Sequence, residues 1–271
     1  MKSAKQEGLE RLVSSPLARR DFAKRMMIGS VAAVGAVALG SSTDLLAQSI
    51  TDVDILNFAL NLEYLEGEFY SVATTGKRLS EIGVGITGRG RAGETTGGSK
   101  VSLDDRIGTI ANQITIDEQT HVAFLRTALG REAVAKPAIN LAALGVGFNS
   151  QAEFLTVAQI FEDVGVSAYR GAAPLLDSAS ILSAAAGIAL TEAQHAGVLR
   201  LLASDNKLQV PQVDAKAIPT FPLPAGRLFF VDGNGLSPAR TTSEVLKIVY
   251  GGGTSSGGFF PNGVNGTITR A

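Results

Sequence analysis

The 271-residue sequence predicts an all-α fold, an antiparallel four-helix bundle with one long crossover between its second and third helices. Three observations predict it. Apolar residues make up 45% of the chain and charged residues 18%, which is typical of a protein with a large core. Four segments of roughly 25 residues carry apolar residues at helical spacing. The link between the second and third segments, about 20 residues, is long enough to return along a bundle.

The first segment, residues 1–47, is predicted to be an export signal and not part of the fold. The pair Arg19-Arg20 stands in a basic stretch, as in a twin-arginine signal. The apolar run 26–39 that follows is shorter than the about 20 residues needed to span a bilayer. Small residues near Ala47 suit cleavage. We therefore expect a periplasmic or extracellular protein with no stable membrane span after signal cleavage.

The bundle is assigned to residues 48–204, where helix starts are marked by a Ser or Thr cap followed three residues later by an acid. This pattern occurs at Thr51/Asp54, Ser102/Asp105 and Ser150/Glu153. Each pair opens a helical segment that ends in Gly or turn residues. A fourth helix is expected over 178–204, after a short turn at 174–177.

The remaining segments are predicted to be less regular. Residues 74–100 are rich in Gly and charge, and they are expected to form a mobile surface insertion. Residues 205–271 are predicted to be an irregular Pro/Gly-rich extension that packs on the bundle or on a partner subunit of a homo-oligomer. Within it, Thr241 and Glu244 predict one short helix that stops at Gly251.

Composition excludes several functions. The net charge of −1 gives no basic surface for nucleic acid. The chain has no cysteine, so disulfides, cysteine zinc sites and thiol nucleophiles are all excluded. Any metal would have to be bound by carboxylates and imidazoles.

The only two histidines each follow a glutamate by three positions. Glu118 and His121 lie in "TIDEQTHVAFL", and Glu192 and His195 lie in "LTEAQHAGVL". Residues three apart share a helix face. The alternative, two exposed polar pairs, is disfavoured by the apolar residues that flank both motifs.

The other two helices each hold a glutamate followed seven residues later by a tyrosine. These are Glu63 with Tyr70 and Glu162 with Tyr169, so the chain contains an internal repeat of a helix pair. Glu66, one turn after Glu63, is the alternative candidate for the glutamate ligand on the first helix. Glu63 is favoured because it matches Glu162 in its spacing to tyrosine.

Four carboxylates at one level of a bundle need positive charge, because burying uncompensated ions costs several kcal/mol each. The first helix, 51–75, contains no Lys or Arg. Arg170 and Arg200 lie toward the helix ends beyond the acids. Four carboxylates with two neutral imidazoles would balance two divalent cations, so a dinuclear metal site is predicted.

This pattern resembles the ferritin-like superfamily of di-iron and di-manganese carboxylate proteins. The leader, the segment "LNFALNLE" and the tail with "VLKIVYGG" and "GGFFPNGVNG" are most similar to its exported desiccation-related group. The resemblance implies that Glu118 and Glu192 bridge two ions, that Glu63 and His121 complete one, and that Glu162 and His195 complete the other.

The resemblance also suggests roles for four further residues. Asp117 is either an acceptor for an imidazole nitrogen or a solvent-exposed acid. Tyr70 and Tyr169 are hydrogen-bonded core residues, partners of ligand carboxylates, or redox groups in catalysis. Glu66 is an extra ligand or a supporting acid.

The ligand types favour Fe or Mn. The resemblance implies reaction with dioxygen or peroxide, ferroxidase-like or catalase-like, in oxidative or desiccation stress protection. The alternative is a non-catalytic stress-protection or structural bundle protein, with or without bound metal. Oxidation of an organic substrate would need an open pocket, which the sequence does not reveal.

Overall fold

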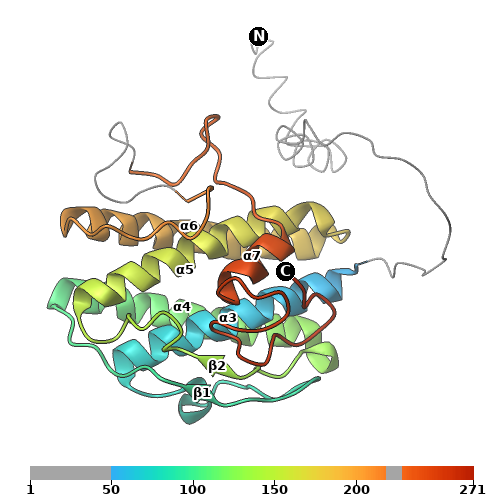
Figure 1. Cartoon of the computed structure of the whole chain (residues 1–271). Coiled ribbons are helices and arrows are strands. Elements are labelled where there is room, and N and C mark those ends of the chain that lie inside the picture. Colours follow the sequence, from blue (N-terminus) through green and yellow to red (C-terminus); the bar gives the residue numbers. More distant parts are fainter. Residues whose placement is uncertain (1–49, 218–227) are drawn as a thin grey trace, which may run out of the picture. The chain divides into compact units, whose positions relative to one another are not determined.

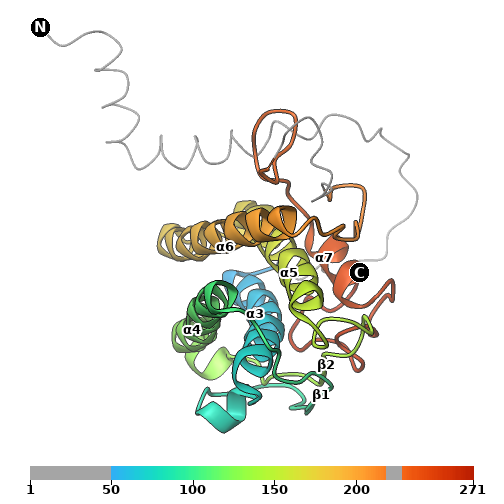
Figure 2. The same ribbon diagram turned by 90° about the vertical axis from the view of Figure 1, so that its left-hand side faces the viewer.

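The computed structural model describes residues 50–217 and 228–271, so the predicted leader lies outside the described residues. Four long helices dominate this part of the chain: α3 (Asp52–Thr75), α4 (Asp105–Leu129), α5 (Gln151–Ala172) and α6 (Ala179–Asp205). α3 packs on α4 and α5 packs on α6, and the two pairs meet through α3 and α5 (Figures 1 and 2). The predicted all-α bundle is confirmed.

The helix starts follow the capping pattern with one exception. Thr51 caps α3 with both halves of the predicted capping box. The box predicted at Ser102/Asp105 is wrong, because α4 begins after Asp104, whose Oδ1 accepts a hydrogen bond from the Ile107 amide at 2.8 Å. A carboxylate in this position also interacts favourably with the positive end of the helix dipole.

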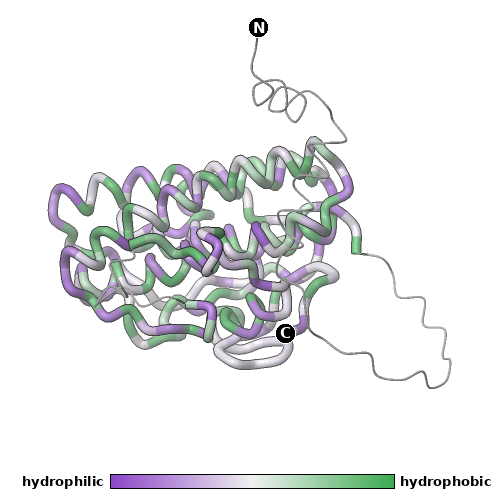
Figure 3. The backbone as a smooth tube through the Cα atoms, turned by 90° about the horizontal axis from the view of Figure 1, so that it is seen from above, coloured by the Kyte–Doolittle hydropathy of each residue, from purple (hydrophilic) through white to green (hydrophobic). Residues whose placement is uncertain are grey.

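α3 is buried on every side. All residues from Ile55 to Ala73 are buried, whereas α4 buries only one stripe. Figure 3 shows hydrophilic and hydrophobic residues alternating along the helices. α3 can be enclosed in this way because segments outside the four helices contribute to its cover. None of the helices within 50–217 and 228–271 is long and apolar enough to cross a membrane.

Residues 74–100 lie largely at the surface, as the sequence predicted, and they are more regular than expected. They contain a short 3-10 helix, η1 (Leu79–Ile82), and β1 (Thr95–Thr96), which pairs in parallel with β2 (Ile139–Asn140) of the crossover. The pairing extends beyond the strands, since the Arg89 amide donates to the Ala133 carbonyl at 2.9 Å. Gly-rich composition here permits close approach of two backbones, and a Cβ on Gly88 would lie 2.3 Å from the Ala133 oxygen.

The described part of the C-terminal extension packs on the bundle. It contains α7 (Thr242–Val249), capped by the predicted Thr241/Glu244 box, and α7 packs on α5. Arg240, just before α7, is buried, and its guanidinium donates to Asp214 and to the Ser167 hydroxyl at 2.7 Å. The segment is thereby fixed to α5 by a charged side chain as well as by apolar contacts.

A buried amide ties the chain's last residues to α3. Asn61 is fully buried; its Nδ2 donates to the Asn265 carbonyl at 2.8 Å and its Oδ1 accepts from the Asn265 amide at 3.0 Å. Asn61→Ala should lower the free energy of unfolding by about 1–3 kcal/mol, because it leaves backbone groups of Asn265 unpaired. Urea denaturation measures this change. Asn262→Ala, at an exposed position, is the control and should have little effect.

Candidate metal centre

The structure brings the six glutamate and histidine residues of the repeat together in the middle of the bundle. Two groups each place four ligand atoms within 4.8 Å of one another: Glu63, Glu118, His121 and Glu192 in the first, and Glu118, Glu162, Glu192 and His195 in the second. All six residues are buried. Glu118 and Glu192 belong to both groups, so their carboxylates lie between two candidate ion positions.

The cluster contains buried polar atoms that the described residues leave without a hydrogen-bond partner. They are Glu63 Oε2, Glu118 Oε1, Glu162 Oε2, both oxygens of Glu192, and His195 Nδ1. Buried carboxylate oxygens without partners carry a large desolvation cost. Oxygen and imidazole donors are the ligands that divalent iron and manganese accept. The residues therefore fit two divalent cations, and the cluster is compatible with a dinuclear metal site.

Without cations, protons must supply the positive charge. Burial alone would lower the pKa of His195, but the carboxylates of Glu118 and Glu162, 3.1 and 3.4 Å from Nδ1, raise it to about 11. The pKa of His121 is also raised, because the carboxylates of Glu118 and Glu192, 3.3 and 3.2 Å from Nδ1, outweigh burial. Burial raises the pKa of Glu118 to about 7, although both imidazoles partly offset it. Each imidazolium proton thus occupies a place that a metal ion would take.

The two tyrosines cross-link the helix pairs. The Tyr70 hydroxyl of α3 donates to Glu162 Oε1 of α5 at 2.6 Å, and the Tyr169 hydroxyl of α5 donates to Glu63 Oε1 of α3 at 2.5 Å. Each bond uses one carboxylate oxygen and leaves Oε2 of the same glutamate without a hydrogen-bond partner in the described structure. The arrangement fixes the orientation of both carboxylates before any ion binds.

Asp117 contacts one of the two imidazoles. Its Oδ2 lies 3.2 Å from His195 Nε2, and its Oδ1 accepts from Gln113 at 3.0 Å. With Nε2 engaged in this way, Nδ1 of His195 is directed at the ligand cluster, 3.1 Å from Glu118 Oε1. Thr191 occupies the matching place before Glu192 in the second half of the repeat.

Two further acids of the bundle are paired with basic side chains. Glu68 is fully buried, with its Oε1 3.5 Å from Lys136 Nζ, and Asp163 forms an ion pair with Arg200. Lys136 comes from the crossover, so the sequence pattern of α3 alone gave no sign of this partner. Both basic side chains are thus engaged by acids outside the six cluster residues.

Glu66 is a fifth carboxylate at the edge of the cluster. A Cβ atom on Gly165 would lie 3.0 Å from Glu192 Oε2 and 3.1 Å from Glu66 Oε1, so both carboxylates lie against this glycine. Burial raises the pKa of Glu66 well above its usual range, and the nearby Glu192 raises it further. Sequence reasoning missed the role of Gly165, although the repeat aligns it with Glu66 and so carried the signal.

Gly165→Ala should therefore disturb the centre. The added methyl group must displace Glu66 or Glu192, and metal affinity should fall by about tenfold or more, as it does when groups that orient ligands are lost. Gly187→Ala on α6 is the matched control, because its Cβ would meet nothing within 4 Å. It should keep metal affinity and raise stability by up to about 1 kcal/mol. Equal metal affinities in the two variants would contradict the placement of these carboxylates.

A four-helix bundle whose core holds two overlapping Glu/His ligand sets has the architecture of the carboxylate dinuclear metal proteins. The chain belongs to the family described as the ferritin-like domain, whose model matches residues 51–205. The resemblance inferred from the sequence is thereby confirmed.

Two relatives are similar to this chain. A desiccation-related protein of Craterostigma plantagineum is 27% identical over 169 residues, covering 56% of this chain and 53% of that protein. The match thus spans about half the length of that relative. A ferritin-like catalase of Nesocodon mauritianus is 22% identical over 268 residues, covering 81% of this chain and 85% of that protein.

Proposed function

We propose that the protein is an exported dinuclear iron or manganese oxidoreductase that breaks down hydrogen peroxide and so protects against oxidative stress. The observation that carries this proposal is the set of buried, unpartnered carboxylate and imidazole atoms that converge in two overlapping groups. The similarity to a ferritin-like catalase over most of the chain favours peroxide over other oxidants.

The bound ions would supply reversible two-electron oxidation and reduction, which the side chains of this cysteine-free protein do not provide. Disproportionation turns two molecules of hydrogen peroxide into two of water and one of dioxygen, so one peroxide loses two electrons and two protons to the other. The protein must therefore accept and return protons near the ions. Glu66 offers a carboxylate oxygen beside Glu192 and lies outside both ligand groups, which suits this task.

The other residues hold the ligands. Glu118 and Glu192 are assigned as bridging carboxylates because each belongs to both groups. Tyr70 and Tyr169 are assigned as positioning residues, since their hydroxyls donate to Oε1 of Glu162 and of Glu63. Asp117 orients His195.

Metal content and turnover test the proposal together. The purified full chain is loaded anaerobically with Fe(II) or Mn(II), and bound metal is counted by elemental mass spectrometry. We expect about two ions per chain, and dioxygen evolution on addition of hydrogen peroxide. No uptake of either metal would overturn the metal assignment. Bound metal with ferrous oxidation but no dioxygen evolution would replace the catalase assignment by a ferroxidase one.

A second function is favoured by the similarity to a desiccation-related protein. In that case the bundle protects under stress without turnover, with or without bound metal. Two bound ions per chain with neither peroxide breakdown nor ferrous oxidation would select this alternative.

Export is part of the proposal and rests on the Arg19-Arg20 pair in the leader. Replacing both arginines by lysine should retain the protein in the cytoplasm of a bacterial host that has the twin-arginine pathway. Cell fractionation and immunoblotting measure this. Continued export of the double variant would contradict the assigned route.

A further inference from the structure

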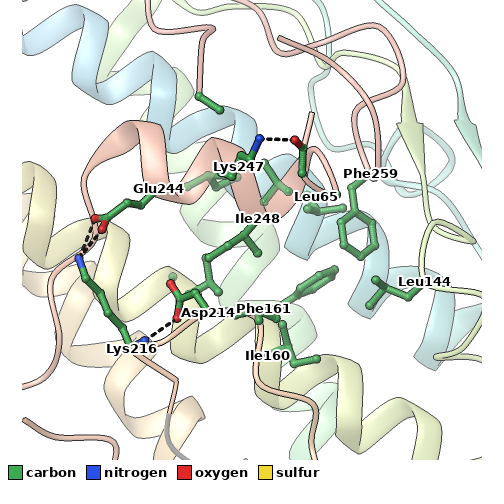
Figure 4. Close-up of a pocket in the computed structure, with 18 of the residues that line it drawn as sticks. Leu65, Leu144, Ile160, Phe161, Asp214, Lys216, Glu244, Lys247, Ile248 and Phe259 are labelled. Carbon is green, nitrogen blue, oxygen red and sulfur yellow. Dashed lines mark hydrogen bonds and ion pairs between the residues drawn. The ribbon is translucent and has the colours of Figure 1, made fainter. Parts of the chain in front are cut away.

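A cavity of about 670 Å³ lies between α3, α5, α7 and residues 213–216. Its walls are apolar and partly aromatic, formed by Leu65, Ile160, Phe161, Ile248 and Phe259 (Figure 4). This size and composition are those of cavities that bind small organic molecules. Local sequence patterns could not predict this cavity, because its walls come from segments far apart in the chain.

The inner end of the cavity reaches the metal centre. Glu66 and Gly165 both line it, and the Glu66 carboxylate lies beside Glu192 over that glycine. A molecule in the cavity would therefore meet a carboxylate that is next to a bridging ligand. This end accepts hydrogen bonds, and the surrounding acids disfavour any anion there.

The outer end of the cavity does not favour the binding of an anion either. Lys216 Nζ lies 2.7 Å from Glu244, and Lys247 Nζ donates to the Gly252 carbonyl, so both lysines at the rim are already engaged (Figure 4). Asp214 at the same rim pairs with Arg240. The lining thus combines apolar walls, a rim of mutually paired charges and a single acceptor at the inner end.

We propose that this cavity binds an uncharged hydrophobic alcohol or phenol, with its apolar body between α5 and α7 and its hydroxyl donating a hydrogen bond to Glu66. The site goes beyond peroxide breakdown, because it places an organic molecule beside the metal centre. It does not require bound metal, so its test is separate from that of the proposed function.

Binding is measured by isothermal titration calorimetry on the full chain, both as purified and after metal loading. The probes are 4-butylphenol, butylbenzene and 4-butylbenzoate, which share one apolar body. We expect the phenol to bind more tightly than the hydrocarbon by about fivefold to tenfold, the worth of one net hydrogen bond. The benzoate should bind least. Tightest binding of the benzoate, or no binding of any probe, would overturn the proposal.

Variants that fill or block the cavity test whether the probes bind there. Ile160→Phe fills the cavity from α5 and should weaken phenol binding at least tenfold, whereas Ile116→Phe, at a position 57% exposed on α4, should not change it. If Ile160→Phe fails to fold, Leu144→Trp provides the same test, because it blocks the rim of the cavity from a half-exposed position. Glu66→Leu should abolish the preference for phenol over butylbenzene. Unchanged binding in both Ile160→Phe and Leu144→Trp would place the probe elsewhere.

Discussion

Replacing Glu192 by Ala should remove both metal ions, lowering the content from about two per chain to almost none. The reason is that this carboxylate belongs to both ligand groups, and Glu118→Ala should act in the same way. Glu63→Ala removes a member of one group only and should leave about one ion bound. Elemental mass spectrometry after anaerobic loading and dialysis measures all three variants.

Two matched variants control this experiment. Glu94→Ala alters an exposed glutamate far from the repeat motifs and should retain both ions. Glu66→Ala should retain most of the metal, because Glu66 is outside both groups. Two ions per chain in Glu118→Ala would show that the bridging assignment is wrong.

A different substitution at this position, Glu192→Gln, should stabilise the metal-free protein. Glu192 is fully buried, and its Oε1 lies 3.2 Å from His121 Nδ1. Burial and the neighbouring Glu118 nevertheless hold the pKa of Glu192 well above its usual range, so Glu192→Gln removes an ionisable group whose charged form is strongly disfavoured there. We expect the metal-free variant to be more stable than the metal-free parent by about 2 kcal/mol. Urea denaturation in the presence of a chelator measures the difference. A less stable variant would indicate that the carboxylate is compensated within the chain.

The stability of the metal-free protein should fall as pH rises. The pKa of His195 is raised from 6.5 to about 11, so its contribution is fully present below pH 6.5 and is lost toward pH 11. The pKa of Glu118 is raised from 4.5 to about 7, so the cost of its charge develops between these values. In both cases the native state binds more protons than the unfolded state, which makes the slope negative.

Metal ions should reverse this trend. Binding displaces the protons held by the imidazoles and carboxylates, so metal affinity increases with pH and the stabilisation by metal grows in parallel. Each proton changes the free energy of unfolding by about 1.4 kcal/mol per pH unit. Denaturation of metal-free and metal-loaded protein between about pH 5 and pH 9 tests this. Curves that stay parallel would contradict proton displacement at the centre.

Local patterns in the sequence predicted the bundle and the residues that meet in it. Glu118 and His121 share a face because they are one turn apart, and the repeat at Glu192 and His195 has the same spacing. The position of each residue along its helix and the side on which it lies follow from helical geometry. The six residues could therefore be selected without knowing how the helices cross. The tyrosines were found by the same repeat, but their crossed pairing with the opposite helix was not.

Contacts between distant segments were beyond the reach of such patterns. The pairing of Glu68 with Lys136 joins α3 to the crossover, and Asn61 binds Asn265 across 204 positions. The insertion after α3 lacked apolar alternation, so its parallel pairing with 139–140 could not be inferred. Gly-rich composition predicts mobility, but it does not show that two backbones lie close together, as they do at Gly88.

The two ligand groups share Glu118 and Glu192, and this overlap has a consequence for how such a protein can arise. Each ion position takes three ligands from one helix pair and one from the other, either Glu192 for the first position or Glu118 for the second. One helix pair alone therefore holds an incomplete set. Two identical copies of it, related by a two-fold axis, would hold both sets in full. A symmetric homodimer of such a helical hairpin would thus bring the same ligand residues together, and fusion of two hairpins into one chain would preserve both candidate ion positions.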